Sequence, residues 1–212
     1  HELQTVDQIA AKSLVLPPGL DLPPLPSRRP RDPSAPPVIL WNARWEYDKQ
    51  PHVVMAALEY LAARGVTFRL IVTGEHIDPT APDLVAARQR WADWTIHWGF
   101  AESRAAYLNL LQQADIVVSA AIQEYFGIAI LEAIACGCVP LLPARLNYPD
   151  LIPPEWHADC LYPTDDDLPL ALERLIGNLP RLMQYNWSAL ALPYRWQNLA
   201  PRYDATLAAL VR

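Results

Sequence analysis

The sequence predicts an α/β fold, in which helices cover both faces of a doubly wound parallel sheet. Short apolar segments alternate with helical segments, and this pattern indicates repeated strand–helix–strand units. The short segments are rich in Val, Ile and Leu and are apolar throughout, as expected for parallel strands buried on both faces. The 212 residues are 52% hydrophobic and 19% charged, which fits a globular domain with a sizeable core.

Residues 1–37 do not have the pattern of a domain, and we expect an interdomain segment followed by a Pro-rich linker. Apolar residues at helical spacing predict a helix over 1–12, and an apolar run predicts a short strand at 13–16. The prolines that follow predict a semi-rigid extended segment up to residue 37.

The regular pattern begins at residue 38, and a Rossmann-like domain is predicted over 38–180. Strands are expected at 38–41, 68–72, 95–98, 115–118, 139–142 and 160–162. Helices are expected at 51–64, 81–92, 103–113, 128–136 and 168–177. Pro51 suits a first helical turn, Ser103 is a typical N-cap, and Gly65 is a typical stop.

Residues 181–212 are predicted to form a C-terminal helical tail that lies over a surface. Four aromatic residues in this tail suit such packing, namely Trp187, Tyr194, Trp196 and Tyr203. We expect Pro193 and Pro201 to interrupt its helices, because proline lacks the N–H that a helix interior needs.

Charge and cysteine content exclude several classes of function. The net charge is −6 and the 17 basic residues are scattered apart from a cluster at 28–31, so a main nucleic-acid surface is not expected. The sequence has no apolar run of about 18 residues and no signal-peptide pattern, and we therefore expect a cytoplasmic protein. Cys136 and Cys138 form C-x-C without a third ligand at zinc spacing, so buried thiols are favoured over a metal site.

Polar residues follow the predicted strands at their carboxyl ends. Because ligands of open α/β sheets bind beyond these ends, we expect the residues to share one site. They are Arg44 and Lys49, then Gly74 and Glu75, then Gly99 and Phe100, and finally Glu124 and Gly127. This mixture of cations, glycines and carboxylates suits a ligand that carries both negative groups and hydroxyls.

The chemistry of these residues gives each a candidate role. Arg44 and Lys49 could hold a diphosphate, or Arg44 could pair with Glu46 or Asp48 while Lys49 is solvated. Gly127 before the predicted helix could let backbone N–H groups approach a phosphate, or could form a simple tight turn.

Two carboxylates eight positions apart, Glu124 and Glu132, flank this glycine. Glu124 could accept hydrogen bonds from a sugar, and Glu132 from two adjacent ribose hydroxyls. The alternative is that Glu124 is a solvated loop acid and Glu132 an exposed helix acid.

Residues 38–142 resemble the C-terminal, donor-binding half of retaining GT-B glycosyltransferases of family 4. The resemblance rests on Arg44-x4-Lys49, Gly74-Glu75, Trp98-Gly99-Phe100, Ala114-Asp115 and Glu124-Tyr-Phe-Gly-x4-Glu132-Ala-x-Ala-Cys-Gly137. Residues 41–49 also resemble the W-N-x-R-W-E-x-D-K signature of the tRNA-queuosine α-mannosyltransferase group. The sequence departs from the general family pattern because Trp41-Asn42-Ala43 replace the usual glycine before Arg44, and Gln50 replaces the glycine after Lys49.

The resemblance implies a GDP-mannose donor, retention at the anomeric carbon and no metal. It implies that Arg44 and Lys49 hold the diphosphate, that Glu124 contacts the transferred sugar, and that Glu132 binds the ribose. It also implies further donor contacts from the residues Gly74, Glu75, Gly99, Phe100, Tyr125, Phe126, Gly127 and Ile128, with Phe100 near the base and 125–127 offering backbone N–H groups.

The same resemblance implies partners that the chain does not itself provide. An N-terminal acceptor domain is expected opposite this half, with an acceptor such as queuosine in tRNA and no membrane contact. Without that domain, we expect the chain to bind donor but to transfer sugar poorly. The alternatives are a non-catalytic nucleotide-binding module on the same fold, and an interaction domain that uses its Trp-rich tail.

Overall fold

The structure, a computed structural model of the chain, describes residues 2–23, 31–32, 34–75 and 80–210. Its centre is a parallel sheet with the strand order β3-β2-β1-β4-β5-β6. The strands are β1 (Val38–Asn42), β2 (Arg69–Thr73), β3 (Thr95–Gly99), β4 (Ile116–Val118), β5 (Val139–Pro143) and β6 (Leu161–Tyr162). The predicted Rossmann-like α/β fold is confirmed, and each predicted strand from residue 38 onward lies within about two residues of an observed one.

The strand order reverses between β1 and β4. From β1 the chain moves outward through β2 to β3, and it then returns to place β4 on the other side of β1. Ile39 is in register with Leu70 of β2 on one side and with Ile116 of β4 on the other. In this topology the carboxyl ends of β1 and β4 diverge, and they leave a crevice for a ligand.

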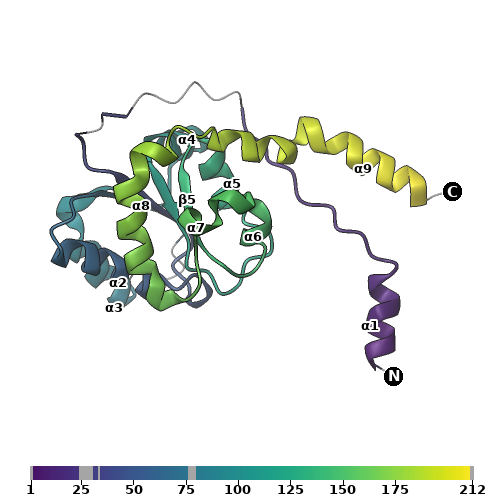
Figure 1. Cartoon of the computed structure of the whole chain (residues 1–212), viewed down its shortest axis with the longest axis horizontal. Helices are drawn as coiled ribbons and strands as arrows, with labels where there is room; N and C mark the ends of the chain where they lie inside the picture. Colours follow the sequence, from purple (N-terminus) through teal and green to yellow (C-terminus); the bar gives the residue numbers. More distant parts are fainter. Residues whose placement is uncertain (1, 24–30, 33, 76–79, 211–212) are drawn as a thin grey trace.

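Helices cover both faces of the sheet (Figure 1). On one face α2 (Pro51–Ala63) packs against α8 (Leu168–Leu182), and on the other α4 (Arg104–Gln113) packs against α5 (Ile128–Ala135). The remaining α-helices that follow the strands are α3 (Pro82–Arg90) and the short α6 (Tyr148–Leu151) and α7 (His157–Cys160). The predicted cap is present, since the Ser103 hydroxyl accepts a hydrogen bond from Ala106 N at 3.1 Å.

Two predictions about helices are wrong near the C-terminus. Helix α8 continues to Leu182, past its predicted end at 177, because leucines at 168, 172, 175, 179 and 182 keep one buried apolar stripe through Pro180. Pro193 lies inside the 3₁₀ helix η5 (Trp187–Tyr194) and Pro201 inside α9 (Trp196–Leu210), so neither interrupts its helix. η5 packs on α5, whereas α9 extends away from the body (Figure 1).

The predicted strand at 13–16 is also wrong. Helix α1 (Glu2–Ala10) stands apart from the body, and the chain after it is extended, with Leu14 and Val15 exposed. A strand needs a neighbouring strand for its backbone groups, and no strand among the described residues pairs with this segment. The segment contacts the C-terminal tail instead, where Tyr203 OH of α9 donates to Leu16 O at 3.4 Å. Further along, Leu20 N donates to Tyr194 O at 2.6 Å and Trp196 N donates to Leu20 O at 3.2 Å. Among the described helices, none is long and apolar enough to cross a membrane.

Candidate functional site

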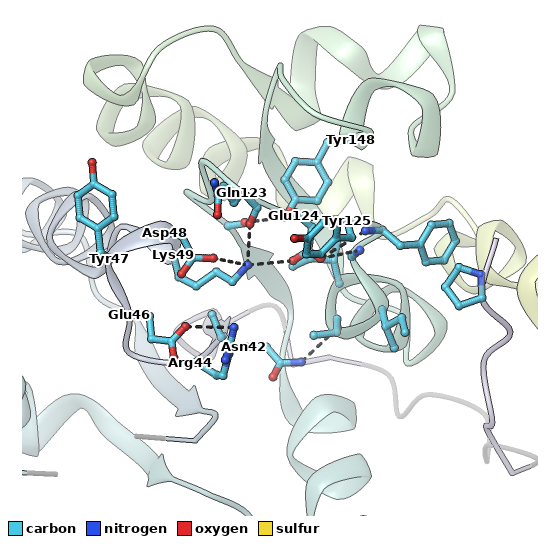
Figure 2. Close-up of a pocket in the computed structure, with 18 residues that line it drawn as sticks. Asn42, Arg44, Glu46, Tyr47, Asp48, Lys49, Gln123, Glu124, Tyr125 and Tyr148 are labelled. Atoms are coloured by element: carbon cyan, nitrogen blue, oxygen red, sulfur yellow. Dashed lines mark hydrogen bonds and ion pairs between the residues drawn. The ribbon is translucent and has the colours of Figure 1, made fainter. Parts of the chain in front are cut away.

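A cavity of about 900 Å³ opens at the carboxyl edge of the sheet, where the strand order reverses. The loop after β1 forms one wall, and the loop after β4 with the start of α5 forms the other (Figure 2). Of the residues predicted for the site, this cavity brings together Arg44, Lys49, Glu124, Tyr125, Phe126, Gly127 and Ile128. We call this cavity the switch-point pocket.

The loop after β1 is held by backbone hydrogen bonds to the end of β2 and the residues that follow it. Ala43 N donates to Thr73 O at 3.0 Å, and Trp45 N donates to Glu75 O at 3.3 Å. A Cβ on Gly74 would lie 2.1 Å from the Ala43 carbonyl oxygen, so only glycine allows this approach. Gly74 and Glu75 therefore support the Arg44 loop and do not themselves line the switch-point pocket.

Lys49 spans the pocket between its two walls (Figure 2). It ends the 3₁₀ turn η1 (Tyr47–Lys49), and Nζ donates to Gln123 O at 2.7 Å. Nζ also lies 3.1 Å from Asp48 Oδ2 and 3.4 Å from Glu124 Oε2. The lysine is therefore not solvated, as the alternative from sequence had it, but is paired with carboxylates on both sides.

Arg44 lies at the mouth of the pocket and pairs with Glu46. Its Nη2 is 3.0 Å from Glu46 Oε2, and its side chain is 52% exposed. An ion pair this exposed contributes about 0 to 1 kcal/mol, so the guanidinium can turn toward a stronger anion at little cost.

Glu124 binds two backbone amides directly before α5. Its Oε1 accepts hydrogen bonds from Gly127 N at 3.0 Å and from Phe126 N at 3.4 Å. Gly127 has φ 89°, a left-handed conformation that favours glycine, and Tyr125 beside it is fully exposed. Two of the three amides predicted to face a ligand, those of Phe126 and Gly127, are thus bound to the Glu124 carboxylate.

Glu132 does not line the switch-point pocket. It is buried on α5, where Oε2 accepts a hydrogen bond from Tyr107 OH at 2.7 Å and Oε1 accepts one from Arg104. The hydrogen bond to Glu132 raises the pKa of Arg104 above its usual value, which keeps the pair charged. The alternative of an exposed helix acid is therefore wrong, and the ribose-binding role stays a prediction.

Gly99 and Phe100 lie away from the switch-point pocket. Gly99 lines a second cavity of about 420 Å³ together with Trp98 and residues of α3, and the Phe100 side chain is exposed. Neither residue lines the switch-point pocket, and their contacts with a donor stay a prediction.

Sequence reasoning missed several residues of the site. Asn42 and Tyr148 line the pocket, and Tyr148 OH lies 2.9 Å from Ser119 Oγ. Burial raises the pKa of the Tyr148 hydroxyl well above its usual range, so this group remains protonated. The position of Asn42 directly after a predicted strand is the signal that could have identified it.

Metal binding has no obvious set of ligands in the part of the chain that the structure describes. There, no group of three His, Cys, Asp or Glu side chains could hold an ion. Cys136 and Cys138 are buried, and Cys138 Sγ donates to Leu111 O at 3.4 Å. A function without metal stays a prediction.

Comparison with known proteins identifies a family and several relatives. Residues 27–178 match the model of the family described as glycosyl transferases group 1. The chain is 36% identical to tRNA-queuosine alpha-mannosyltransferase of Drosophila melanogaster over 117 residues, which cover 55% of this chain and 31% of that protein.

Two bacterial relatives are also mannosyltransferases by name. The chain is 30% identical over 105 residues to GDP-mannose:cellobiosyl-diphosphopolyprenol alpha-mannosyltransferase of Xanthomonas oryzae pv. oryzae, covering 49% of this chain and 28% of that protein. It is 28% identical over 178 residues to a GDP-mannose-dependent alpha-(1-6)-phosphatidylinositol dimannoside mannosyltransferase of Mycobacterium tuberculosis. This match covers 82% of this chain and 44% of that protein. The chain thus spans between 28% and 44% of the length of these three relatives (31% for the first).

Solved glycosyltransferase structures share the fold. The catalytic domain of cholesterol-alpha-glucosyltransferase from Helicobacter pylori superimposes with a TM-score of 0.61 and 23% identity, covering 76% of this chain and 99% of that one. Sucrose-phosphate synthase from Thermosynechococcus elongatus gives a TM-score of 0.66 at 21% identity, and the match covers 85% of this chain and 47% of that one.

Proposed function

The chain belongs to the group 1 glycosyltransferase family, and we propose that it is the donor-binding domain of a retaining mannosyltransferase. The donor is GDP-mannose, and the acceptor is a molecule such as queuosine in tRNA. The choice of mannose is supported by the names of three relatives, two of which specify GDP-mannose.

The opposition of cations and a helix N-terminus across the switch-point pocket carries the proposal. Arg44 and Lys49 come from the β1 side, and the amides of Phe126 and Gly127 at the start of α5 come from the β4 side. A diphosphate between them would meet positive charge from two sides. Such a site stabilises the negative charge that develops on the departing nucleoside diphosphate, which is the task a metal ion performs in other transferases.

Glu124 is proposed to contact the transferred sugar. Its carboxylate already lies between Lys49 Nζ and the α5 amides, at 3.4 Å and 3.0 Å. When phosphate oxygens take over the amides and the lysine, the carboxylate becomes free to accept hydrogen bonds from sugar hydroxyls. Glu132 is proposed to accept hydrogen bonds from the ribose, in exchange for the one that Arg104 now donates.

Partners beyond the donor belong to the proposal as well. An acceptor domain facing this pocket would supply the tRNA contact, and the chain alone would bind donor with little turnover. The share of the relatives' length that the chain covers, at most 44% for the three described, supports this expectation.

Calorimetric titration of the chain tests the donor assignment. GDP-mannose and GDP should bind, UDP and ADP should bind more weakly, and excess EDTA should leave the affinity unchanged. A parallel assay would follow mannose transfer from GDP-mannose to tRNA that contains queuosine. Absence of GDP-mannose binding would refute the proposal, while affinity that disappears with EDTA would refute a metal-free site.

A further inference from the structure

A half-buried tyrosine, Tyr107, joins the end of β1 to α5 beside the switch-point pocket. Tyr107 on α4 has its hydroxyl 2.7 Å from Asn42 Nδ2 and 2.7 Å from Glu132 Oε2. Asn42 Nδ2 also lies 3.1 Å from Ala129 O in the first turn of α5. These contacts fix Asn42, the last residue of β1, against two helices.

The donors and acceptors in this network have only one consistent arrangement. The Glu132 carboxylate, which accepts from Arg104, offers only acceptors, so the Tyr107 hydroxyl must donate its single proton to Glu132. Burial, followed by the charge of Glu132, raises the pKa of Tyr107 far above its usual value, so this proton is retained. The hydroxyl oxygen can then only accept from its other neighbour, which must be the amide nitrogen of Asn42.

This arrangement decides which atom Asn42 presents to the pocket. Both amide hydrogens are directed to partners, one to Tyr107 OH and one to Ala129 O. Both hydrogen bonds of the Asn42 side chain come from Nδ2, and Oδ1 is not one of the buried unpaired polar atoms among the described residues. Because Asn42 lines the switch-point pocket, this oxygen is the atom available to a ligand there. Figure 2 shows the amide nitrogen of Asn42 turned toward α5, with the oxygen on the opposite side.

We propose that Asn42 Oδ1 is a hydrogen-bond acceptor for a hydroxyl group of the bound sugar nucleotide, and that Tyr107 is the residue that positions it. The inference rests on the proposed function and deepens it. An uncharged acceptor cannot bind a phosphate oxygen, which is itself an acceptor, but it matches a hydroxyl of the ribose or of the transferred sugar. Asn42 thereby separates the hydroxyl-binding part of the pocket from the diphosphate part at Arg44 and Lys49.

The chain contains a matched control on α2. Tyr60 OH lies 3.2 Å from Glu173 Oε2, Arg64 Nε lies 2.7 Å from Glu173 Oε1, and the Arg64 guanidinium is 5.4 Å from the Tyr60 ring centroid. In the Tyr107 network the corresponding guanidinium of Arg104 is 5.2 Å from the ring. The two networks have the same chemistry, but the α2 network does not line the switch-point pocket.

The experiment compares Asn42→Ala, Tyr107→Phe and Tyr60→Phe by calorimetric titration with GDP-mannose, GDP and inorganic pyrophosphate. We expect Asn42→Ala and Tyr107→Phe to weaken GDP-mannose binding by roughly threefold to tenfold, the value of one hydrogen bond, and to leave pyrophosphate binding unchanged. Tyr60→Phe should leave all three affinities unchanged. A loss already present with GDP assigns the hydroxyl to the ribose, and a loss confined to GDP-mannose assigns it to the sugar.

Thermal unfolding of each variant checks that it folds. If Tyr107→Phe does not fold, the result with Asn42→Ala decides the question. The inference is overturned if Asn42→Ala binds GDP-mannose as tightly as the wild type does, or loses as much affinity for pyrophosphate. If the wild-type chain binds neither GDP-mannose nor GDP, the proposed function fails first and the inference fails with it.

Discussion

Replacing Arg44 with alanine is the most direct test of the diphosphate assignment. The side chain is 52% exposed, and it pairs with Glu46 at 3.0 Å. Because exposed ion pairs contribute about 0 to 1 kcal/mol, the free energy of unfolding should fall by less than about 1 kcal/mol. Any larger effect of Arg44→Ala must therefore appear in ligand binding.

The expected loss of binding follows from the contact that Arg44 would make. A charge-assisted hydrogen bond to a phosphate is worth about 2 kcal/mol, which corresponds to roughly a 30-fold higher Kd for GDP. In the wild type, part of this gain is offset because Arg44 must first leave Glu46. Glu46→Gln should therefore tighten GDP binding by up to about fivefold, the equivalent of 1 kcal/mol.

Titration calorimetry with GDP at constant ionic strength measures both effects. Arg64→Ala is the control, since Arg64 is 55% exposed, pairs with Glu173 at 2.7 Å and lies outside the switch-point pocket. It removes the same charge and should change the Kd by less than about twofold, as expected for screened long-range effects. An unchanged Kd in Arg44→Ala, or an equal loss in Arg64→Ala, would refute the assigned role of Arg44.

Three further predictions concern the loop after β4, which forms one wall of the switch-point pocket, and the buried core. Glu124→Gln should keep the side chain near the amides of Phe126 and Gly127 and lower the free energy of unfolding by about 1 kcal/mol, because hydrogen bonds to a neutral acceptor are weaker. The variant should retain GDP binding in titrations and abolish transfer in the assembled enzyme. Gly127→Ala should lower the free energy of unfolding by about 1 to 2 kcal/mol in urea titrations, because φ is 89° and the added Cβ would lie 3.4 Å from the Tyr148 ring; an unchanged midpoint would argue against this strain. All three cysteines are buried, and burial raises the pKa of Cys160 to about 12, so a thiol reagent at neutral pH should label none of them until the chain unfolds; rapid labelling of Cys160 in the folded chain would contradict its burial.

The sheet was predictable because its signals are local. The central strands β1, β4 and β5 are short, mostly apolar runs, and burial in a parallel sheet accommodates such runs. The edge strand β3 contains Thr95 and His97 and has no buried residue, so its prediction rested on the regular alternation with helices. The apolar-run signal failed at 13–16, where Leu14 and Val15 are exposed and no strand among the described residues pairs with the segment. Whether an apolar run becomes a strand depends on its partner, and the partner is set by the tertiary fold.

The site was predictable only where it follows from topology. Arg44, Lys49 and Glu124 come together because they follow β1 and β4, the two strands at which the order reverses. The surroundings of Glu132 were not predictable, because its partners Arg104 and Tyr107 lie 28 and 25 residues earlier in the chain, on another helix. No spacing within α5 indicates that this carboxylate is buried and paired.

The polar groups of the switch-point pocket are already bonded to one another, and the strength of each of these contacts determines how much a ligand gains by replacing it. Lys49 is held by Gln123 O and by two carboxylates, and the amides of Phe126 and Gly127 are held by Glu124. A diphosphate that replaces these contacts gains only the difference between new and old hydrogen bonds. Arg44 gives up an exposed pair that contributes little, so nearly the whole phosphate contact is gained there. Arg44, whose ion pair with Glu46 is the weakest of these contacts, should therefore contribute most to affinity. We expect Arg44→Ala to weaken GDP binding more than Glu124→Gln does.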